Sequence, residues 1–285
     1  MIPDDSSIST PAGAPAADSS ASPATSAADI TLTQDLRVPW TWLDIFLLAV
    51  IALVGTALFK MLLLGVFAKF GIPGVQIAKS PALFGLFSVL QQLMITVALL
   101  AYLAAQVRLN FRAPFWRTIG WRPLEPGPLP MAVQICGWIA AGFVLGFVVQ
   151  SVTLRFASRT KLPVQALYQD RRVALALMLM AVFVAPAFEE TIFRGYIYPV
   201  VARTYGMAVG VFATGILFGL MHAAQLWGGW LQICEIIIVG IIMTYARAAT
   251  RTVLSSFLIH VSYNFFVSFG NLLLLPWYRF ITSRH

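Results

Sequence analysis

The chain has 285 residues, of which 59% are hydrophobic and only 11% charged, and its mean hydropathy is +0.83. Soluble domains carry about 25% charged residues, so this composition excludes a soluble globular enzyme, a coiled coil and a disordered protein as descriptions of the whole chain. The net charge of +8 does not indicate a nucleic-acid-binding protein, because Lys and Arg separate apolar runs instead of clustering. The composition predicts an all-α, polytopic membrane helix bundle.

The first 36 residues differ from the rest of the chain. They contain five Asp and no Lys or Arg, whereas the remaining residues carry a net charge of +13. Pro, Ala, Ser and Thr fill 21 of the first 29 positions, which predicts a disordered tail. A secretory signal peptide is not expected, because it needs a basic start followed by an apolar core. The sequence therefore divides into a tail, 1–36, and a transmembrane helical domain, 37–285.

Seven apolar runs follow, each near the roughly 20 residues that a spanning helix needs. They cover approximately residues 42–67, 80–107, 131–154, 173–202, 206–224, 230–246 and 252–275. Proline lacks a backbone N–H and breaks many helices, so Pro186 in the fourth run leaves the number of spans at seven or eight. With seven spans, Lys and Arg divide almost evenly between the two sides, and the positive-inside rule does not decide the orientation.

An ionisable side chain is costly inside a spanning helix, so each one is a candidate for a functional role. The fourth run holds Glu189, Glu190 and Arg194. Glu190 precedes Arg194 by four residues, which places both on one helix face in the order that favours an ion pair. Glu189 lies about 100° further round the helix and has no local partner, so it is the best candidate for a reactive group.

Two histidines lie in later apolar runs. The fifth run ends near His222, and the seventh carries His260 and Asn264, four residues apart on one face. Such residues often only pack or join helices through hydrogen bonds. Together with the two glutamates, however, they fit a hydrolytic site, because Glu can act as general base to water and His and Asn can stabilise an oxyanion. Two His and one Glu are also a common catalytic zinc set.

These residues form an ordered series of motifs on three successive apolar runs. The motifs are Glu189-Glu190-xxx-Arg194, Phe218-xxx-His222 and His260-xxx-Asn264. In order and spacing they resemble the CPBP family of intramembrane proteases, also called the CAAX prenyl endopeptidase or Abi family. The string FEETIFRG is similar to the family's first motif as well. The resemblance covers approximately residues 173–270.

The resemblance implies an eight-helix membrane bundle with a peptidase site inside a cavity. In the metal-free form of the mechanism, Glu189 activates the attacking water with His222 beside it. His260 and Asn264 then hold the oxyanion.

The resemblance also implies that Glu190 and Arg194 form a supporting ion pair. With a metal, Glu189, His222 and His260 are the ligands of zinc, and Glu190 is available as the base. A metallopeptidase is the favoured interpretation, and Glu189 is essential in either form.

Three classes of function remain open. The leading hypothesis is an intramembrane endopeptidase that cleaves a membrane-associated peptide or protein substrate. The alternative is a proton- or ion-coupled transporter that uses the same carboxylates and histidines. The third is a non-catalytic membrane partner. Motifs of other intramembrane proteases, HExxH and GxGD, are absent from the sequence, and no Ser has a rhomboid-type context.

The composition also bears on the cellular setting. The 19 cations are 15 Arg and 4 Lys, and Ala is abundant, which indicates a bacterial source. We therefore expect a multi-pass protein of the bacterial plasma membrane, in contact with the lipid bilayer and without nucleic-acid partners. Prenylated substrates are not expected there.

Four other polar residues have simpler interpretations. Glu235 is expected near the interface, where a carboxylate is solvated. Lys60 either snorkels to the surface or faces the cavity. Gln91 and Gln92 are expected to bridge helices.

Overall fold

The computed structural model describes residues 33–156 and 162–282, with side chains up to residue 269. Every regular element in these two ranges is a helix. In chain order they are η1 (Gln34–Leu36), α1 (Trp42–Lys69), α2 (Gly74–Lys79), α3 (Pro81–Ala105), η2 (Gln106–Asn110), α4 (Phe115–Thr118), α5 (Met131–Phe156), η3 (Pro163–Tyr168), α6 (Arg171–Leu179), η4 (Met180–Val184), α7 (Ala185–Glu190), η5 (Thr191–Ile197), α8 (Tyr198–Tyr205), α9 (Met207–Met221), α10 (Trp230–Thr250) and α11 (Val253–Thr282). The all-α fold class is confirmed.

All seven predicted apolar runs are helical. Five helices in the described part of the chain are long and apolar enough to cross a membrane: α1, α3 with η2, α5, the continuous stretch Arg171–Tyr205, and α10. Two shorter apolar helices, Met207–Met221 and Val253–Phe269, correspond to the fifth and seventh runs. The protein is therefore a multi-pass membrane protein. The described residues give seven apolar helices, and the eighth that the family resemblance implied is not formed by a break in the fourth run.

The helix of the fourth run continues past Pro186 because its backbone hydrogen bonds change there from a spacing of four residues to a spacing of five. Residues 180–184 are π-helical, and the N–H of Ala185 bonds to the carbonyl of Met180, five residues back. The next bond of that kind would need a proline N–H, which does not exist, so the carbonyl of Ala181 needs another donor. Asn264 of α11 donates its Nδ2–H to that oxygen at 2.7 Å. A side chain from another helix thus replaces the missing bond.

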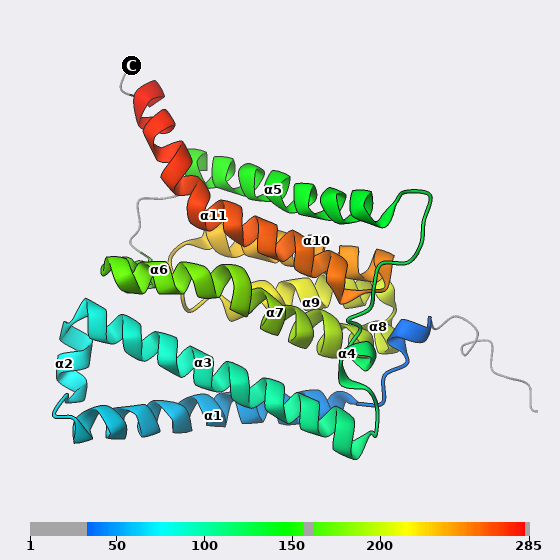
Figure 1. Ribbon diagram of the computed structural model, residues 1–285, viewed down its shortest axis with the longest axis horizontal. Coiled ribbons are helices and arrows are strands. Elements are labelled where there is room, and N and C mark those ends of the chain that lie inside the picture. Colours follow the sequence, from blue (N-terminus) through cyan, green and yellow to red (C-terminus); the bar gives the residue numbers. More distant parts are fainter. Residues whose placement is uncertain (1–32, 157–161, 283–285) are drawn as a thin grey trace, which may run out of the picture. The chain divides into compact units, whose positions relative to one another are not determined.

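Small residues let the helices of the bundle approach closely. Cβ atoms added at Gly215 and Gly219 of α9 would lie within 2.5 Å of side-chain atoms of α10. A Cβ at Gly142 of α5 would lie 2.0 Å from the Ser262 hydroxyl of α11. Figure 1 shows α5 running beside α11, and α1 beside α3. Close backbone approach of this kind provides the van der Waals contact that holds membrane helices together.

The chain ahead of α1 is fixed to the bundle. Asp35 of η1 forms a buried ion pair with Arg247 of α10 at 2.8 Å. Trp40 is fully buried, stacks on Tyr196 with ring centroids 4.7 Å apart, and donates its indole N–H to the Tyr196 carbonyl. Residues 33–36, which we had assigned to the disordered tail, are therefore ordered. The rest of the predicted tail, 1–32, lies outside the described residues.

Candidate active site

A cavity of about 560 Å³ lies among α1, α3, η3, α6, η4, α7, α9, α10 and α11. Four of the six predicted site residues line it: Glu189, His222, His260 and Asn264. Glu190 and Arg194 are not part of its lining. The structure thus brings the predicted residues together from α7, α11 and the end of α9, and divides them into a group that faces the cavity and a pair that does not.

The division between the two glutamates follows from helix geometry. Successive residues of a helix point about 100° apart, so neighbours cannot share a face. The Glu189 side chain is 21% exposed, and that of Glu190 is fully buried. The carboxylate of Glu189 faces the cavity, and that of Glu190 faces the interior of the bundle.

Glu190 and Arg194 form a buried ion pair. Arg194 Nη1 lies 3.0 Å from Glu190 Oε1, and both side chains are fully buried. The guanidinium also donates to the Thr244 hydroxyl and, at 2.9 Å, to the carbonyl of Gly240 on α10. Its Cζ lies 4.4 Å from the centre of the Phe218 ring. A buried charge is tolerated when it is paired and hydrogen-bonded in this way.

His260 lies between the two glutamates. Its Nδ1–H donates to Glu190 Oε1 at 2.8 Å, because a carboxylate only accepts. Its Nε2 then faces Glu189, whose Oε2 is 3.6 Å away. That distance exceeds a hydrogen bond, so the Glu189 oxygen is placed to accept from a water molecule. The imidazole is 3% exposed, and Glu190 fixes its orientation.

His222 terminates α9 and presents one edge of its ring to the cavity. Its Nδ1–H donates to the backbone carbonyl of Phe218, four residues back, at 2.9 Å. This bond leaves Nε2 for the cavity that His222 lines. The Phe218 ring lies beside both histidines, with centroid distances of 5.0 Å to His222 and 5.6 Å to His260. One aromatic side chain therefore packs against both imidazoles and the Arg194 guanidinium.

Asn264 links α11 to the fourth helical run through a hydrogen bond to the Ala181 carbonyl. One N–H of its amide is used by the Ala181 carbonyl, and the second N–H and the oxygen remain at the cavity that Asn264 lines. His260 and Asn264 do not bond to each other, although they share a face of α11. Each instead joins α11 to the long helix that carries Glu189 and Glu190.

The predicted zinc ligands do not converge as placed. His222 and His260 each use Nδ1 in a hydrogen bond and keep Nε2, which is compatible with metal ligation, so the ligand test rests on whether the three side chains converge. Among the described residues, no group of three His, Cys, Asp or Glu side chains is arranged to hold a metal ion. Glu190, considered above as the base of a zinc mechanism, is buried in its ion pair and away from the cavity. The described side chains as placed do not form a metal site, and we derive no step through a metal.

The cavity has further polar residues that sequence reasoning did not assign to the site. Thr56 of α1 and Ser88, Gln91 and Gln92 of α3 line it together with the residues above. Gln91 donates to the backbone carbonyl of Thr56 at 3.3 Å, which confirms that it bridges two helices, whereas Gln92 bonds to Thr96 on its own helix. Ser88, with Gln91 and Gln92 three and four residues later on the apolar helix α3, is the signal that would have identified this part of the lining.

Glu235 lies away from the cavity lining and is not solvated as we had expected. Its carboxylate is buried and accepts a hydrogen bond from Thr153 of α5 at 2.7 Å. The reason is that α5 packs across the first turns of α10 and covers the carboxylate there. Lys60 of α1 is exposed, which agrees with a side chain that reaches a surface.

Comparison with known proteins finds a family model that matches one segment of the chain. Residues 171–266 match the family model described as type II CAAX prenyl endopeptidase Rce1-like. The matched segment begins at the start of α6 and contains all six predicted site residues. No curated protein and no solved structure matches the chain.

Proposed function

The chain carries an Rce1-like, CAAX-type endopeptidase domain of the CPBP family, and from this premise we propose that Glu189 is the general base of an intramembrane peptide-bond hydrolase. The observation that carries the proposal is the separation of two adjacent carboxylates. Glu190 is committed to Arg194 and His260, while Glu189 lies on the cavity with its oxygen 3.6 Å from His260 Nε2. A carboxylate within reach of water and not held by a strong cation is suited to accept a proton.

The proposed reaction begins with a water molecule held by Glu189 in the cavity. Glu189 takes one proton of the water, and the resulting hydroxide oxygen forms a bond to the carbonyl carbon of the substrate. When the C–N bond breaks, the amine leaving group receives the proton that Glu189 had accepted. Atoms and charge balance without a cofactor, and the carboxylate is regenerated.

The tetrahedral intermediate carries an oxyanion that needs hydrogen-bond donors. We assign this role to the second N–H of the Asn264 amide and to His260 as an imidazolium, whose Nε2–H donates while its Nδ1–H stays on Glu190; both residues line the cavity from α11. Glu190 orients His260 through Nδ1, and Ala181 holds Asn264 by its other N–H. Donors that are fixed before the reaction stabilise developing charge without reorganisation. His222 completes the cavity beside Glu189.

The substrate in this proposal is a membrane-associated peptide or protein segment. Glu189, His222 and His260 are the acid and the two histidines of the cavity lining, and none of the lining residues is a Lys or Arg. An uncharged stretch of peptide backbone therefore suits the cavity. The host membrane is proposed to be a bacterial plasma membrane, on the composition alone.

The experiment that tests the proposal is cleavage of membrane-anchored peptides by the purified full chain in proteoliposomes. Glu189→Ala and His222→Ala should each lower the cleavage rate by at least about 10²-fold. Glu125→Ala, which removes an exposed acid from the loop before α5, is the matched control and should cleave at the wild-type rate. Treatment with a chelator should leave the wild-type rate unchanged, because no step uses a metal.

Three results would contradict the proposal. Wild-type cleavage by Glu189→Ala would remove the base from the mechanism. Ion-dependent solute flux in the same proteoliposomes, without cleavage of any peptide, would favour the transporter. Loss of activity in the chelator with recovery on addition of zinc would restore Glu189, His222 and His260 as a ligand set.

A further inference from the structure

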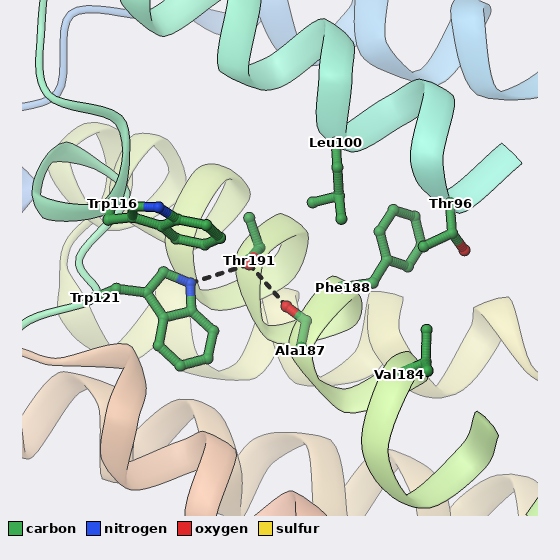
Figure 2. A pocket seen from close by; sticks show the side chains of 8 residues that line it. All are labelled: Thr96, Leu100, Trp116, Trp121, Val184, Ala187, Phe188 and Thr191. Carbon is green, nitrogen blue, oxygen red and sulfur yellow. Dashed lines mark hydrogen bonds between the residues drawn. The ribbon is translucent and has the colours of Figure 1, made fainter. Parts of the chain in front are cut away.

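A second cavity, of about 430 Å³, lies outside the candidate active site. Its volume is within the range of small-molecule sites, about 300–1,000 Å³. It is lined by Thr96, Leu100, Trp116, Trp121, Val184, Ala187, Phe188 and Thr191. Figure 2 shows Trp116 and Trp121 together at one end, with Thr96 and Val184 at the other. We call it the tryptophan pocket.

The few polar atoms of the tryptophan pocket are engaged in hydrogen bonds. The Trp121 indole N–H donates to the Thr191 hydroxyl at 3.0 Å, and that hydroxyl donates to the Ala187 carbonyl at 2.7 Å, as the dashed lines in Figure 2 mark. The Thr96 hydroxyl accepts from Gln92. A ligand inside this pocket therefore meets an apolar surface, and an aliphatic chain is the chemistry that fits it.

Positive charge lies next to the tryptophan end of the pocket. Arg117 follows Trp116, and Arg122 follows Trp121. Arg122 Nε–H donates to the backbone carbonyl of Arg117 at 3.2 Å, which places its guanidinium beside α4. The ion pairs among the described residues involve neither guanidinium. Trp residues followed by Arg mark the level of the lipid headgroups, where a phosphate meets such cations.

We propose that the tryptophan pocket binds one acyl chain of an anionic phospholipid, whose phosphate pairs with Arg117 and Arg122. An apolar cavity alone would accept the chain of any lipid. The two adjacent arginines select an anionic headgroup, since each basic residue near the membrane surface adds attraction to anionic lipid.

The position of the pocket gives the lipid a consequence for the active site. Ala187 and Phe188 directly precede Glu189 in α7, and Thr191 directly follows Glu190. A chain in the pocket packs against the segment whose other face presents Glu189 to the active-site cavity. Because catalysis depends on the position of the base, we expect anionic lipid to raise the cleavage rate. This consequence rests on the proposed function, whereas lipid binding does not.

The test is native mass spectrometry of the purified full chain, released from nanodiscs that contain equal amounts of phosphatidylglycerol and phosphatidylcholine. The wild type should retain phosphatidylglycerol in preference. The double variant Arg117→Gln, Arg122→Gln should lose that preference by about tenfold. Arg171→Gln, Arg172→Gln removes two exposed cations from the start of α6 as the matched control and should retain the wild-type preference.

A second variant tests the pocket itself. Leu100→Trp fills the cavity and should reduce retention of both lipids, and a thermal melt checks that this variant is folded. Equal retention of the two lipids by the wild type, or wild-type retention by folded Leu100→Trp, would overturn the proposal. If the wild type retains phosphatidylglycerol but cleaves no peptide in any lipid, the proposed function fails and the lipid site stands.

Discussion

Helices α1 and α3 (the α1–α3 pair) and the matched residues 171–266 (the Rce1-like segment) are both apolar and helical. They differ in the fraction of their residues that is buried. In the most apolar window of α10, 50% of the residues are buried, whereas in that of α1 only 11% are. Arg194 reaches across to α10 with two hydrogen bonds, and His260 reaches across to Glu190 with a third. In the α1–α3 pair, Gln91 donates to the Thr56 carbonyl at 3.3 Å, and Gln106 of η2, which continues α3, donates to Asp44 of α1 at 2.7 Å near the end of the pair.

This difference indicates that the two regions contribute to the cavity in different ways. The Rce1-like segment holds its ionisable residues in fixed positions by burial and by hydrogen bonds between helices. The α1–α3 pair contributes exposed apolar surface and a polar lining with few cross-helix contacts. We infer that the first region provides the chemistry and requires precision, and that the second encloses the cavity and tolerates change.

The largest effect on stability is expected from Arg194→Met. This variant leaves the Glu190 carboxylate buried without its cation, which costs about 3–5 kcal/mol of unfolding free energy. Denaturant titration in detergent measures the change. The double variant Glu190→Gln, Arg194→Met removes both charges and should recover part of the loss. Wild-type stability of Arg194→Met would show that the pair does not hold the Rce1-like segment together.

A smaller effect is expected from Asn264→Leu. The Ala181 carbonyl loses the donor that replaces the missing proline bond, at a cost of about 1 kcal/mol for a hydrogen bond between membrane helices. Cleavage should fall further, by about 10²-fold, if the second N–H of the amide supports the oxyanion. A variant that loses stability but cleaves at the wild-type rate would leave Asn264 with the structural contact only.

The smallest effect is expected in the α1–α3 pair. Gln91→Leu removes the bond to the Thr56 carbonyl, and the unfolding free energy should change by less than about 0.6 kcal/mol. The same denaturant titration compares it with Arg194→Met. A loss as large as that of the ion-pair variant would remove the distinction between the two regions.

The sequence predicted the helices well and also indicated which charged residues belong to the candidate site, for a physical reason. Charge is rare in a membrane protein, so Glu189, Glu190 and Arg194 stood out within one heptapeptide, and their i, i+4 spacing predicted the ion pair that the structure contains. The pattern did not predict that His260 lies against Glu190, because 70 residues separate them and only the packing of α11 brings them together.

The behaviour of the chain at Pro186 was also beyond the pattern. From regular α-helix geometry one expects proline to break or kink the helix. A π-helical turn that accommodates the proline cannot be predicted from that geometry. The Asn264 amide that compensates for the missing N–H comes from another helix, so no local signal reveals it. The order of residues 33–36 depends likewise on Arg247, more than 200 positions away.

The central claim is that two adjacent glutamates have separate roles, and one paired measurement tests it most directly. Glu189→Gln and Glu190→Gln are each assayed for thermal unfolding and for peptide cleavage in the same preparation. The account predicts that Glu189→Gln unfolds as the wild type does but cleaves no peptide, and that Glu190→Gln is destabilised, because its amide replaces the carboxylate that pairs with Arg194 and His260. Wild-type cleavage by Glu189→Gln, or a stable and inactive Glu190→Gln beside it, would contradict the account.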